Sequence, residues 1–384
     1  DYLNNISIGA IAQDPNNLGT IYVGTGEGYP NADAITGTGM FKTTDDGETW
    51  DWVASTQTPA FANIYEVYVH TNGDIYVCTQ NGGILRSKDG AQTWEKVLGS
   101  GLSGSFSNTF YDFKYIPANQ TFFASNDNSI FKSTTGDRGD WANIGTTQPG
   151  FPNDLQRVEF DVCPTSPEVI YCVGNINSLS SNVFESQDGG ATWQTRAIPP
   201  IMSDNYGQGW YDLDIAVDPF NCLHIIAGGI GLAESFNQGL TWQPLFGIHS
   251  DEHNITFDPT DIGRILFGCD GGFWMSENNG QTIVDKSINY VTTQFYGCAI
   301  HPAAASPYIM GGAQDNGTHA IKDPGLSPSD HVTGADGMLC FIDQADPNFQ
   351  ISSSQNGGWN LSTDGGNNFS GGLVSVNGDW VDWS

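Results

Sequence analysis

The sequence predicts an all-β protein, a β-propeller of about eight four-stranded antiparallel blades with a repeated box in their turns. Three observations predict it: an eight-residue box that returns seven times, a second landmark that precedes it, and the absence of sustained helical periodicity. The repeats follow one another at about 40 to 50 residues, a period typical of propeller blades. The fold class therefore follows from the repeat as a whole.

The box has the form Ser/Thr-x-Asp-x-Gly-x-Thr-Trp, with residues 43–50 (TTDDGETW) as its first copy. We interpret it as the hairpin turn between the third and fourth strands of a blade. Its Ser and Asp side chains can bond nearby backbone groups, its Gly allows a positive φ, and its aromatic residue is expected to pack beneath the turn. The copies, three of them decayed, begin at Thr43, Ser87, Ser133, Ser186, Ser235, Ser276 and Ser362.

The second landmark is an alternating apolar run that ends in Asp-Pro or a relative, followed by a turn and another β-rich run. Clear examples are residues 10–24 (AIAQDPNNLGTIYVG), 214–228 (DIAVDPFNCLHIIAG) and 254–268 (NITFDPTDIGRILFG). Alternation with β-branched and aromatic residues predicts the first two strands of each blade. Weaker versions at Val67, Phe113, Asp161, Cys298 and Cys340 complete eight units.

These motifs resemble the Asp-box (BNR repeat) propellers, a group that includes sortilin-type domains, xyloglucanase-like glycoside hydrolases and sialidases. Segments 24–47, 208–219 (QGWYDLDIAVDP) and 249–259 (HSDEHNITFDP) are similar to large secreted Bacteroidetes proteins exported by the type IX pathway. The resemblance covers nearly the whole chain. It implies the fold and a secreted or cell-surface location, but the group mixes enzymes with receptors. We expect residues 1–384 to form a single propeller region of a longer multidomain protein, with the GDWV segment (378–381) opening a further strand.

Composition excludes some partners. The chain has 12 basic and 43 acidic residues and a net charge of −31, which disfavours nucleic acids and anionic membrane surfaces. No apolar stretch is long enough to span a bilayer. The acidity serves either solubility or divalent-cation binding, so a divalent cation such as calcium is the candidate cofactor.

Seven cysteines are scattered along the chain. Cys163 and Cys172 flank one turn, so either a disulfide across this hairpin or buried thiols is expected. Cys298 and Cys340 occupy the same register of the first strand in two units, where small buried core residues fit. No CxxC or CxxH pattern supports a zinc site.

Propeller geometry places the boxes and the Asp-Pro turns on one face. The starts of the first strands and the loops between second and third strands lie on the other face. Aligning the units on Asp-Pro reveals a polar or amphipathic residue seven places earlier, which is expected at the mouth of the central channel. With three neighbours, these predicted ligand-binding residues are Gln156, Tyr211, Asp212, Asp251, Gln294, Tyr296, Asp315 and Asp336. The alternative is that they solvate the channel and cap strand ends.

One segment within this set suggests a metal site. His249, Asp251 and His253 alternate, so on an extended strand they share a face. Two imidazoles and a carboxylate are a competent ligand set. His249 and His253 would lie about 13 Å apart on a strand, which makes it awkward for all three residues to bind one ion. Two of the three together with a residue of a neighbouring blade form the more realistic site. A hydrogen-bonded polar cluster is the alternative.

The long loop of residues 24–40 holds Glu27, Tyr29 and Asp33 and is expected to overhang the same face. By resemblance, a sialidase needs clustered arginines, but the five here are scattered. A xyloglucanase-like enzyme needs paired carboxylates between two facing propellers, and only Glu27 falls near such a position.

We therefore expect a non-catalytic binding or structural module for a glycan or an extracellular protein. A polysaccharide-directed glycoside hydrolase of xyloglucanase-like type is the alternative. No membrane insertion is expected, and the outer-membrane secretion machinery is a candidate partner during export.

Overall fold

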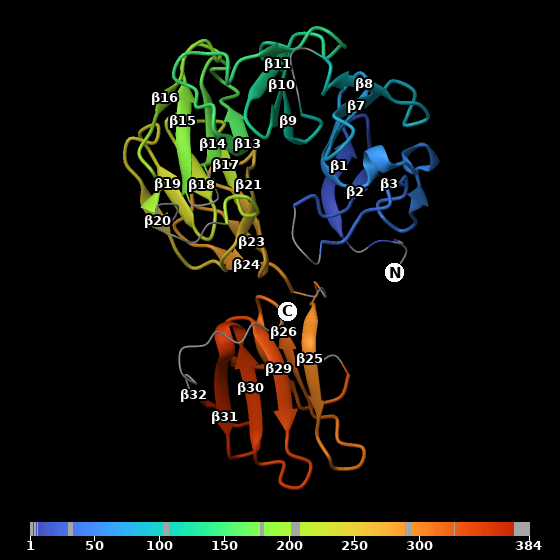
Figure 1. The fold of residues 1–384 in the computed structure, drawn as a ribbon, viewed down its shortest axis with the longest axis vertical. Coiled ribbons are helices and arrows are strands. Elements are labelled where there is room, and N and C mark those ends of the chain that lie inside the picture. The colour runs from blue at the N-terminus through green and yellow to red at the C-terminus, as the bar shows by residue number, and fades with distance from the viewer. Residues whose placement is uncertain are drawn as a thin grey trace. The chain divides into compact units, whose positions relative to one another are not determined.

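The computed structural model describes residues 3, 5, 7–29, 34–102, 107–176, 180–200, 208–288, 290, 293–325 and 327–371. They form eight four-stranded antiparallel sheets, with the strands of each sheet in chain order (Figure 1). The predicted all-β class and the four-stranded blades are confirmed. Asp33 and the GDWV segment lie outside the described residues.

The described part of the chain has three single-turn 3₁₀ helices, η1 (Ala54–Thr56), η2 (Pro59–Phe61) and η4 (Gln355–Gly357). No helix formed by the described residues has the length and apolar character needed to cross a membrane.

The chain divides into two compact units, and the first comprises residues 1–269 and 273–286. It contains six blades, in which β9, β13, β17 and β21 lie toward the middle and β16 and β20 at the periphery (Figure 1). The first blade is β1 (Ile8–Asp14), β2 (Asn17–Thr25), β3 (Met40–Thr43) and β4 (Asp51–Trp52), and the second is β5 (Ile64–Val69), β6 (Ile75–Thr79), β7 (Ile84–Ser87) and β8 (Glu95–Leu98). The third is β9 (Phe110–Ile116), β10 (Thr121–Asn126), β11 (Ile130–Ser133) and β12 (Ala142–Asn143), and the fourth is β13 (Leu155–Val162), β14 (Ile170–Ile176), β15 (Ser180–Ser186) and β16 (Gln194–Thr195). The fifth is β17 (Asp214–Val217), β18 (Ile225–Gly228), β19 (Leu232–Ser235) and β20 (Gln243–Leu245), and the sixth is β21 (Glu252–Phe257), β22 (Ile265–Cys269), β23 (Gly272–Ser276) and β24 (Val284–Asp285).

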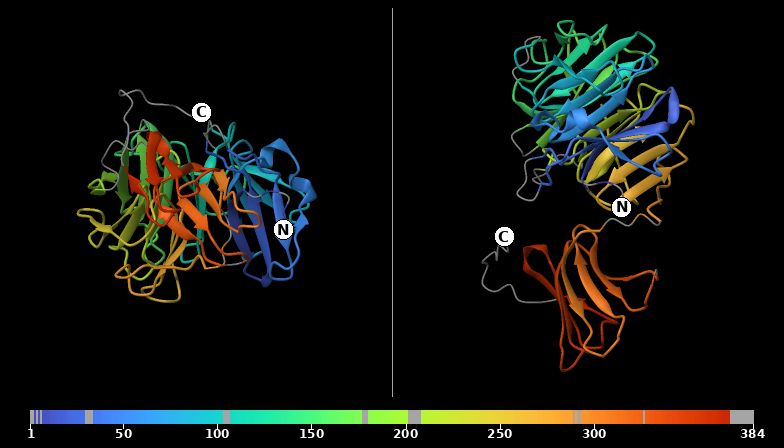
Figure 2. Two further views of the ribbon diagram at one scale, coloured as in Figure 1. Left: turned by 90° about the horizontal axis from the view of Figure 1, so that it is seen from below. Right: turned by 90° about the vertical axis from the view of Figure 1, so that its right-hand side faces the viewer.

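The second unit comprises residues 270–272 and 287–384 and contains two blades, coloured orange to red in Figure 2. They are β25 (Phe295–Ile300), β26 (Ile309–Ala313), β27 (Gly317–Ile321), β28 (Asp330–Thr333); and β29 (Gly337–Ile342), β30 (Gln350–Ser354), β31 (Gly358–Ser362), β32 (Ser370–Gly371). Strands β25 and β29 pack against each other, and Tyr308, Met310 and Ile342 are buried in the apolar cluster of this unit.

The first strand of each blade is the innermost, and in the first unit β1, β5, β9, β13, β17 and β21 pack side by side in that order. Apolar side chains fill the layers between neighbouring blades. Phe113 of β9, for example, packs with Tyr76 of the preceding blade, and Ile215 of β17 packs with Tyr171. Burial of such side chains stabilises the fold by roughly 25 cal/mol for each Å² of apolar surface removed from water.

The box forms the turn between the third and fourth strands, as predicted. In the first copy the Thr43 hydroxyl donates to Asp45 Oδ1 at 2.7 Å, and Asp45 accepts from the backbone and hydroxyl of Thr49. Gly47 provides the left-handed conformation at φ 93°. The bond from the first to the third box residue recurs in the copies that begin at Ser87, Ser186, Ser235, Ser276 and Ser362.

Two of the box tryptophans also join neighbouring blades. The indole of Trp193 donates to the carbonyl of Ile144 at 2.7 Å, and that of Trp242 donates to Ala197 at 2.8 Å. Each acceptor follows the last strand of the preceding blade. The box therefore ties one blade to the next as well as closing its own hairpin.

The predicted division into two ends is confirmed within the units. At one end, box residues donate to carbonyls of the first turn of the same blade, as Asp46 does to Gly19 and Asn279 to Gly263. At the other end, the start of β21 meets the β18–β19 turn of the preceding blade through a bond from Glu252 to Gly229.

The cysteine predictions were correct for Cys172, which is a buried free thiol, and wrong for Cys163, Cys298 and Cys340. Cys163 forms a disulfide with Cys222, with 5.5 Å between their Cα atoms, and not with Cys172. Cys172 pairs across the hairpin with Phe160 and is buried toward the preceding blade, whereas Cys163 lies in the layer shared with the following blade. Cys298 is exposed and Cys340 is half-buried, so neither is a fully buried core residue.

The disulfide connects the first turns of two adjacent blades across 59 residues of chain. Because a cross-link of this span restricts the unfolded chain, replacing Cys163 and Cys222 with serine is expected to lower the free energy of unfolding by about 2–4 kcal/mol. Urea titration of the two proteins measures the difference. Cys298→Ser, at an exposed free thiol, serves as the control and is expected to change little.

Candidate functional site

The predicted ligand-binding residues of the first unit do lie at the starts of innermost strands. Gln156 is the second residue of β13 and is exposed. Tyr211 and Asp212 lie shortly before β17, which begins at Asp214, and Asp251 immediately precedes β21. Tyr211 and Asp251 are half-buried, whereas Asp212 is only 1% exposed.

Tyr29, from the long loop of residues 24–40, packs among three other tyrosines. Its ring centroid lies 5.3 Å from that of Tyr65, 6.4 Å from that of Tyr111 in a stacked arrangement, and 5.4 Å from that of Tyr211. These rings belong to segments of the first, second, third and fifth blades. Burial raises the pKa of Tyr29 to about 12, so its hydroxyl stays protonated and can donate. The loop therefore inserts a side chain among the strand starts.

Arg157 of β13 holds this aromatic group in place. It is 4% exposed and its guanidinium lies 4.4 Å from the centroid of the Tyr29 ring. All five of its N–H groups have acceptors within the protein. These are Glu159 Oε1 at 2.8 Å, the Tyr29 hydroxyl at 2.9 Å, and the carbonyls of Trp210, Tyr211 and Leu213. Arg157 therefore links three blades through hydrogen bonds, and all five of its donors are used.

Four acidic residues occupy one register on four consecutive inner strands. They are Glu66 on β5, Asp112 on β9, Glu159 on β13 and Asp214 on β17, and we call them the inner carboxylate row. Each stands four residues before the residue that leads into the first turn of its blade. Lys114 Nζ approaches this row and lies 3.5 Å from a carboxylate oxygen of Asp112 and 3.5 Å from one of Asp161.

The inner carboxylate row holds more acid than the adjacent cations neutralise. Burial raises the pKa of Glu159 to about 8 against the opposing effect of Arg157, and raises that of Asp214 to about 6 against the effect of Lys114. Burial and the charge of Asp112 together hold the pKa of Glu66 well above its usual range. These groups therefore retain protons at a pH at which exposed carboxyls are ionised.

Two carboxylates also satisfy backbone groups of the next blade. Asp161 accepts from the backbone N–H of Val217 at 2.8 Å, and Asp214 accepts from that of Ile255. The innermost strand of a blade is an edge strand of its sheet. The N–H groups on its unpaired side therefore need hydrogen-bond acceptors from another part of the chain. Both acids therefore have a structural role between blades.

The geometry expected for the predicted metal ligands is wrong. His249 and Asp251 precede β21, and Asp251 has φ 64°, so the three residues do not alternate along one extended strand. His253 instead lies with its Nε2 3.6 Å from Asp212 Oδ1. Among the described residues, the groups of three or more side chains close enough to share an ion include neither His249 nor His253.

A small aromatic surface remains accessible at these strand starts. Trp210 and Tyr211 are half-buried with their rings 5.4 Å apart, and His253 packs edge-on against Tyr211 at 4.9 Å. The His253 side chain is 31% exposed, and Gln208 donates to Asp212 Oδ2 behind it. We call the side chains of Trp210, Tyr211 and His253, together with exposed Gln156, the strand-start site.

In the second unit, Asp315 donates its backbone N–H to Asp336 Oδ1 at 2.8 Å, and Asp336 donates its own to Gln355 Oε1 at 2.9 Å. Gln294 accepts from the backbone of Gln314. Tyr296 is 42% exposed. The second unit therefore brings Asp315 and Asp336 together at its strand starts.

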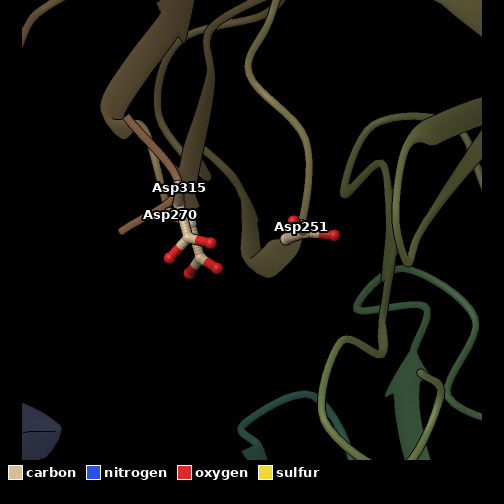
Figure 3. A group of neighbouring side chains, drawn as sticks. All are labelled: Asp251, Asp270 and Asp315. Carbon is tan, nitrogen blue, oxygen red and sulfur yellow. The ribbon is translucent and has the colours of Figure 1, made fainter. Parts of the chain in front are cut away.

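Carboxylate oxygens are the ligands that calcium prefers. Asp270 and Asp315, both of the second unit, have carboxylate oxygens within 4.8 Å of each other (Figure 3). Asp251, also drawn there, belongs to the first unit. The composition suggested calcium without assigning its ligands, and calcium binding stays a prediction.

Reasoning from the sequence missed Arg157, the inner carboxylate row and the part that Tyr29 plays. The row had a usable signal, because an acid stands four residues before the turn in four consecutive units. The alignment on Asp-Pro drew attention to the position seven residues before it. No local pattern pointed to Arg157, because its acceptors lie up to 128 residues away.

No model of a known protein family matches the sequence, and comparison with curated proteins finds no match. Among solved structures, an ancestral GH74 enzyme is similar with a TM-score of 0.61 and 15% identity, covering 96% of this chain and 57% of that one. The extracellular domain of a putative hybrid two-component system from B. thetaiotaomicron gives 0.50 and 12%, covering 94% and 52%. YCF48 bound to D1 peptide gives 0.49 and 16%, covering 82% and 93%.

The chain spans little more than half the length of the first two of these proteins. Identities of 15% and 12% show a shared β-propeller fold, and this fold is found in both an enzyme and the extracellular domain of a putative two-component system.

Proposed function

We propose that this protein is a non-catalytic binding module whose strand-start site binds a glycan. The supporting observation is the contrast between two groups of side chains. Two of the carboxyls with raised pKa values, which acid–base hydrolysis would require, are already engaged, Glu159 with Arg157 and Asp214 with the backbone N–H of Ile255. The half-buried aromatic rings of Trp210, Tyr211 and His253 instead offer a surface on which a sugar ring can stack.

The disulfide between Cys163 and Cys222 supports a secreted or cell-surface location, since disulfides persist in oxidising compartments. The net charge of −31 favours a soluble protein and disfavours nucleic acids as partners. As part of the proposal, the chain belongs to a longer exported protein.

Glycan-array screening of the chain, with and without a chelator, tests the binding proposal. We expect Gln156→Ala and Tyr211→Ala each to weaken binding of the glycans identified by about tenfold or more, because a hydrogen bond or a stacking surface is lost. Gln156 is exposed, so its replacement is not expected to disturb the fold. Tyr290→Ala, at an aromatic residue with 64% exposure, is the matched control.

A reducing-sugar assay on the same glycans separates binding from hydrolysis. No release of reducing ends is expected. Release that Glu159→Gln abolishes, in a protein that remains folded, would contradict the proposal and favour a glycoside hydrolase. Unchanged binding in both strand-start variants would instead remove the site assignment.

A further inference from the structure

The fifth blade, β17 to β20, carries a cluster of exposed apolar side chains at the end where the box and the first turn meet. Phe220 and Leu223 come from the first turn, and Phe236 and Leu240 come from the box. Their exposures are 46%, 46%, 49% and 56%. We call these four residues the blade-five surface. It lies at the opposite end of the strands from the strand-start site.

Direct contacts join the two segments of this surface. The backbone N–H of Gln238 in the box donates to the carbonyl of Leu223 at 3.0 Å. The Phe236 ring stacks on the buried His224 ring with 4.3 Å between centroids. Asp218, whose carboxylate bonds His224 at 3.0 Å, also accepts from the backbone of Phe220. The first turn and the box, which carry these four residues, are thus held side by side.

The other blades show that the fold does not require apolar residues at these positions. Where the fifth blade has Phe236, the second residue of the other boxes is Thr44, Lys88, Thr134, Gln187, Glu277 and Thr363. Where it has Leu240, the matching residues of the regular boxes are Glu48, Gln92, Ala191, Gln281 and Asn367.

The first turn shows the same contrast. The residues that match Phe220 and Leu223 are Asn16 and Gly19 in the first blade, Thr165 and Glu168 in the fourth, and Thr260 and Gly263 in the sixth. Their structural setting is equivalent, because the carbonyls of Gly19, Glu168 and Gly263 accept the same backbone bond from the box as Leu223 does. Large apolar residues exposed together without a folding requirement indicate an interaction surface.

The charges on the neighbouring blades indicate the chemistry of the partner. Exposed carboxylates flank the surface, with Glu168 and Asp188 on the fourth blade and Glu277 on the sixth. Two nearby cations are already paired, Arg196 with Glu185, and Arg264 with Asp258 and Asp261, and Lys132 donates to the carbonyl of Gly189. A partner with apolar side chains flanked by Lys or Arg is therefore electrostatically complementary.

Two other occupants fit less well. The four side chains carry no hydrogen-bonding groups, which a glycan would need for orientation. A second copy would bring together two chains that each carry a net charge of −31. We propose that the blade-five surface binds a polypeptide segment that combines aromatic or aliphatic side chains with basic residues.

Fluorescence polarisation with three synthetic 12-residue peptides tests this proposal. One contains Leu, Phe and Lys, the second has Glu in place of every Lys, and the third has Ser in place of every apolar residue. We expect only the first to bind, and Phe236→Thr with Leu240→Gln to weaken its binding at least tenfold. Both substitutions reproduce residues that other boxes of this chain carry, so the blade is expected to fold.

Leu18→Gln, at an apolar residue of the first blade with 63% exposure, is the matched control and should leave binding unchanged. The proposal is overturned if no peptide binds, if the Ser or Glu peptide binds as well as the first, or if the double variant binds like the parent chain. A dimer in sedimentation velocity that the double variant abolishes would assign the surface to a second copy. Glycan binding at the strand-start site is expected to persist in the double variant, so the two proposals fail separately.

Discussion

Arg157→Met is expected to lower the free energy of unfolding by about 3–5 kcal/mol, among the largest effects of any single substitution in this chain. The change removes the donors that satisfy buried Glu159, the Tyr29 hydroxyl and three carbonyls that precede the fifth blade. A buried acceptor without a donor carries its full desolvation cost. Urea unfolding followed by tryptophan fluorescence measures the loss.

Two further variants separate the charge of Arg157 from its geometry. Arg157→Lys keeps a cation but lacks the five-donor fork, so it should recover only part of the stability. Arg138→Met, at an exposed arginine in the decayed third box, is the matched control and should change stability by less than about 0.5 kcal/mol. A loss at Arg157 no larger than this control would show that these hydrogen bonds contribute nothing to folding.

Stability of the first unit is expected to fall as the pH rises from 5 to 8. In the folded protein the pKa of Asp214 is raised to about 6 and that of Glu159 to about 8, whereas carboxyl groups of the unfolded chain have pKa values of about 4. Between those values the folded state binds more protons than the unfolded state, so the free energy of unfolding decreases with pH. Each unit of pKa difference corresponds to about 1.4 kcal/mol, which predicts a total change of a few kcal/mol.

Urea midpoints measured across this pH range test the prediction. Glu66→Gln removes one buried acid whose pKa burial raises, so it should make stability less dependent on pH and raise it at pH 8. Glu48→Gln, at an exposed residue of the first box, is the control and should leave the slope unchanged. Stability that rises between pH 5 and 8 in the parent chain would mean that the inner carboxylate row is ionised at the acid end of the range.

Below pH 5 the aspartates of the boxes are expected to reverse this dependence of stability on pH. Hydrogen bonds from Thr49 and Thr43 lower the pKa of Asp45 to about 2, and Asp89 behaves in the same way with Thr93 and Ser87. A lowered pKa adds stability that is present above the unfolded value and is lost as the pH falls toward 2. The first unit should therefore be most stable in mildly acidic solution.

The sequence by itself determined the blades, the turns and the two ends of the strands. A box such as residues 43–50 carries its own hydrogen-bond partners within eight residues, so its structure follows from local spacing. Alternation in a run such as residues 214–217 likewise depends only on neighbours in the chain. These features repeat, and each copy confirmed the others.

Tertiary structure decided which side chains meet. Arg157 finds Tyr29 across 128 residues, Cys163 finds Cys222 across 59, and Asp251 leaves the extended conformation that alternation assumed. Contacts of this kind depend on how blades pack around their inner strands, a long-range arrangement that local periodicity does not encode. The blade-five surface depends on both the local sequence and the tertiary structure. Its residues are visible in the aligned repeats, but only the folded chain shows that the turn and the box present them together.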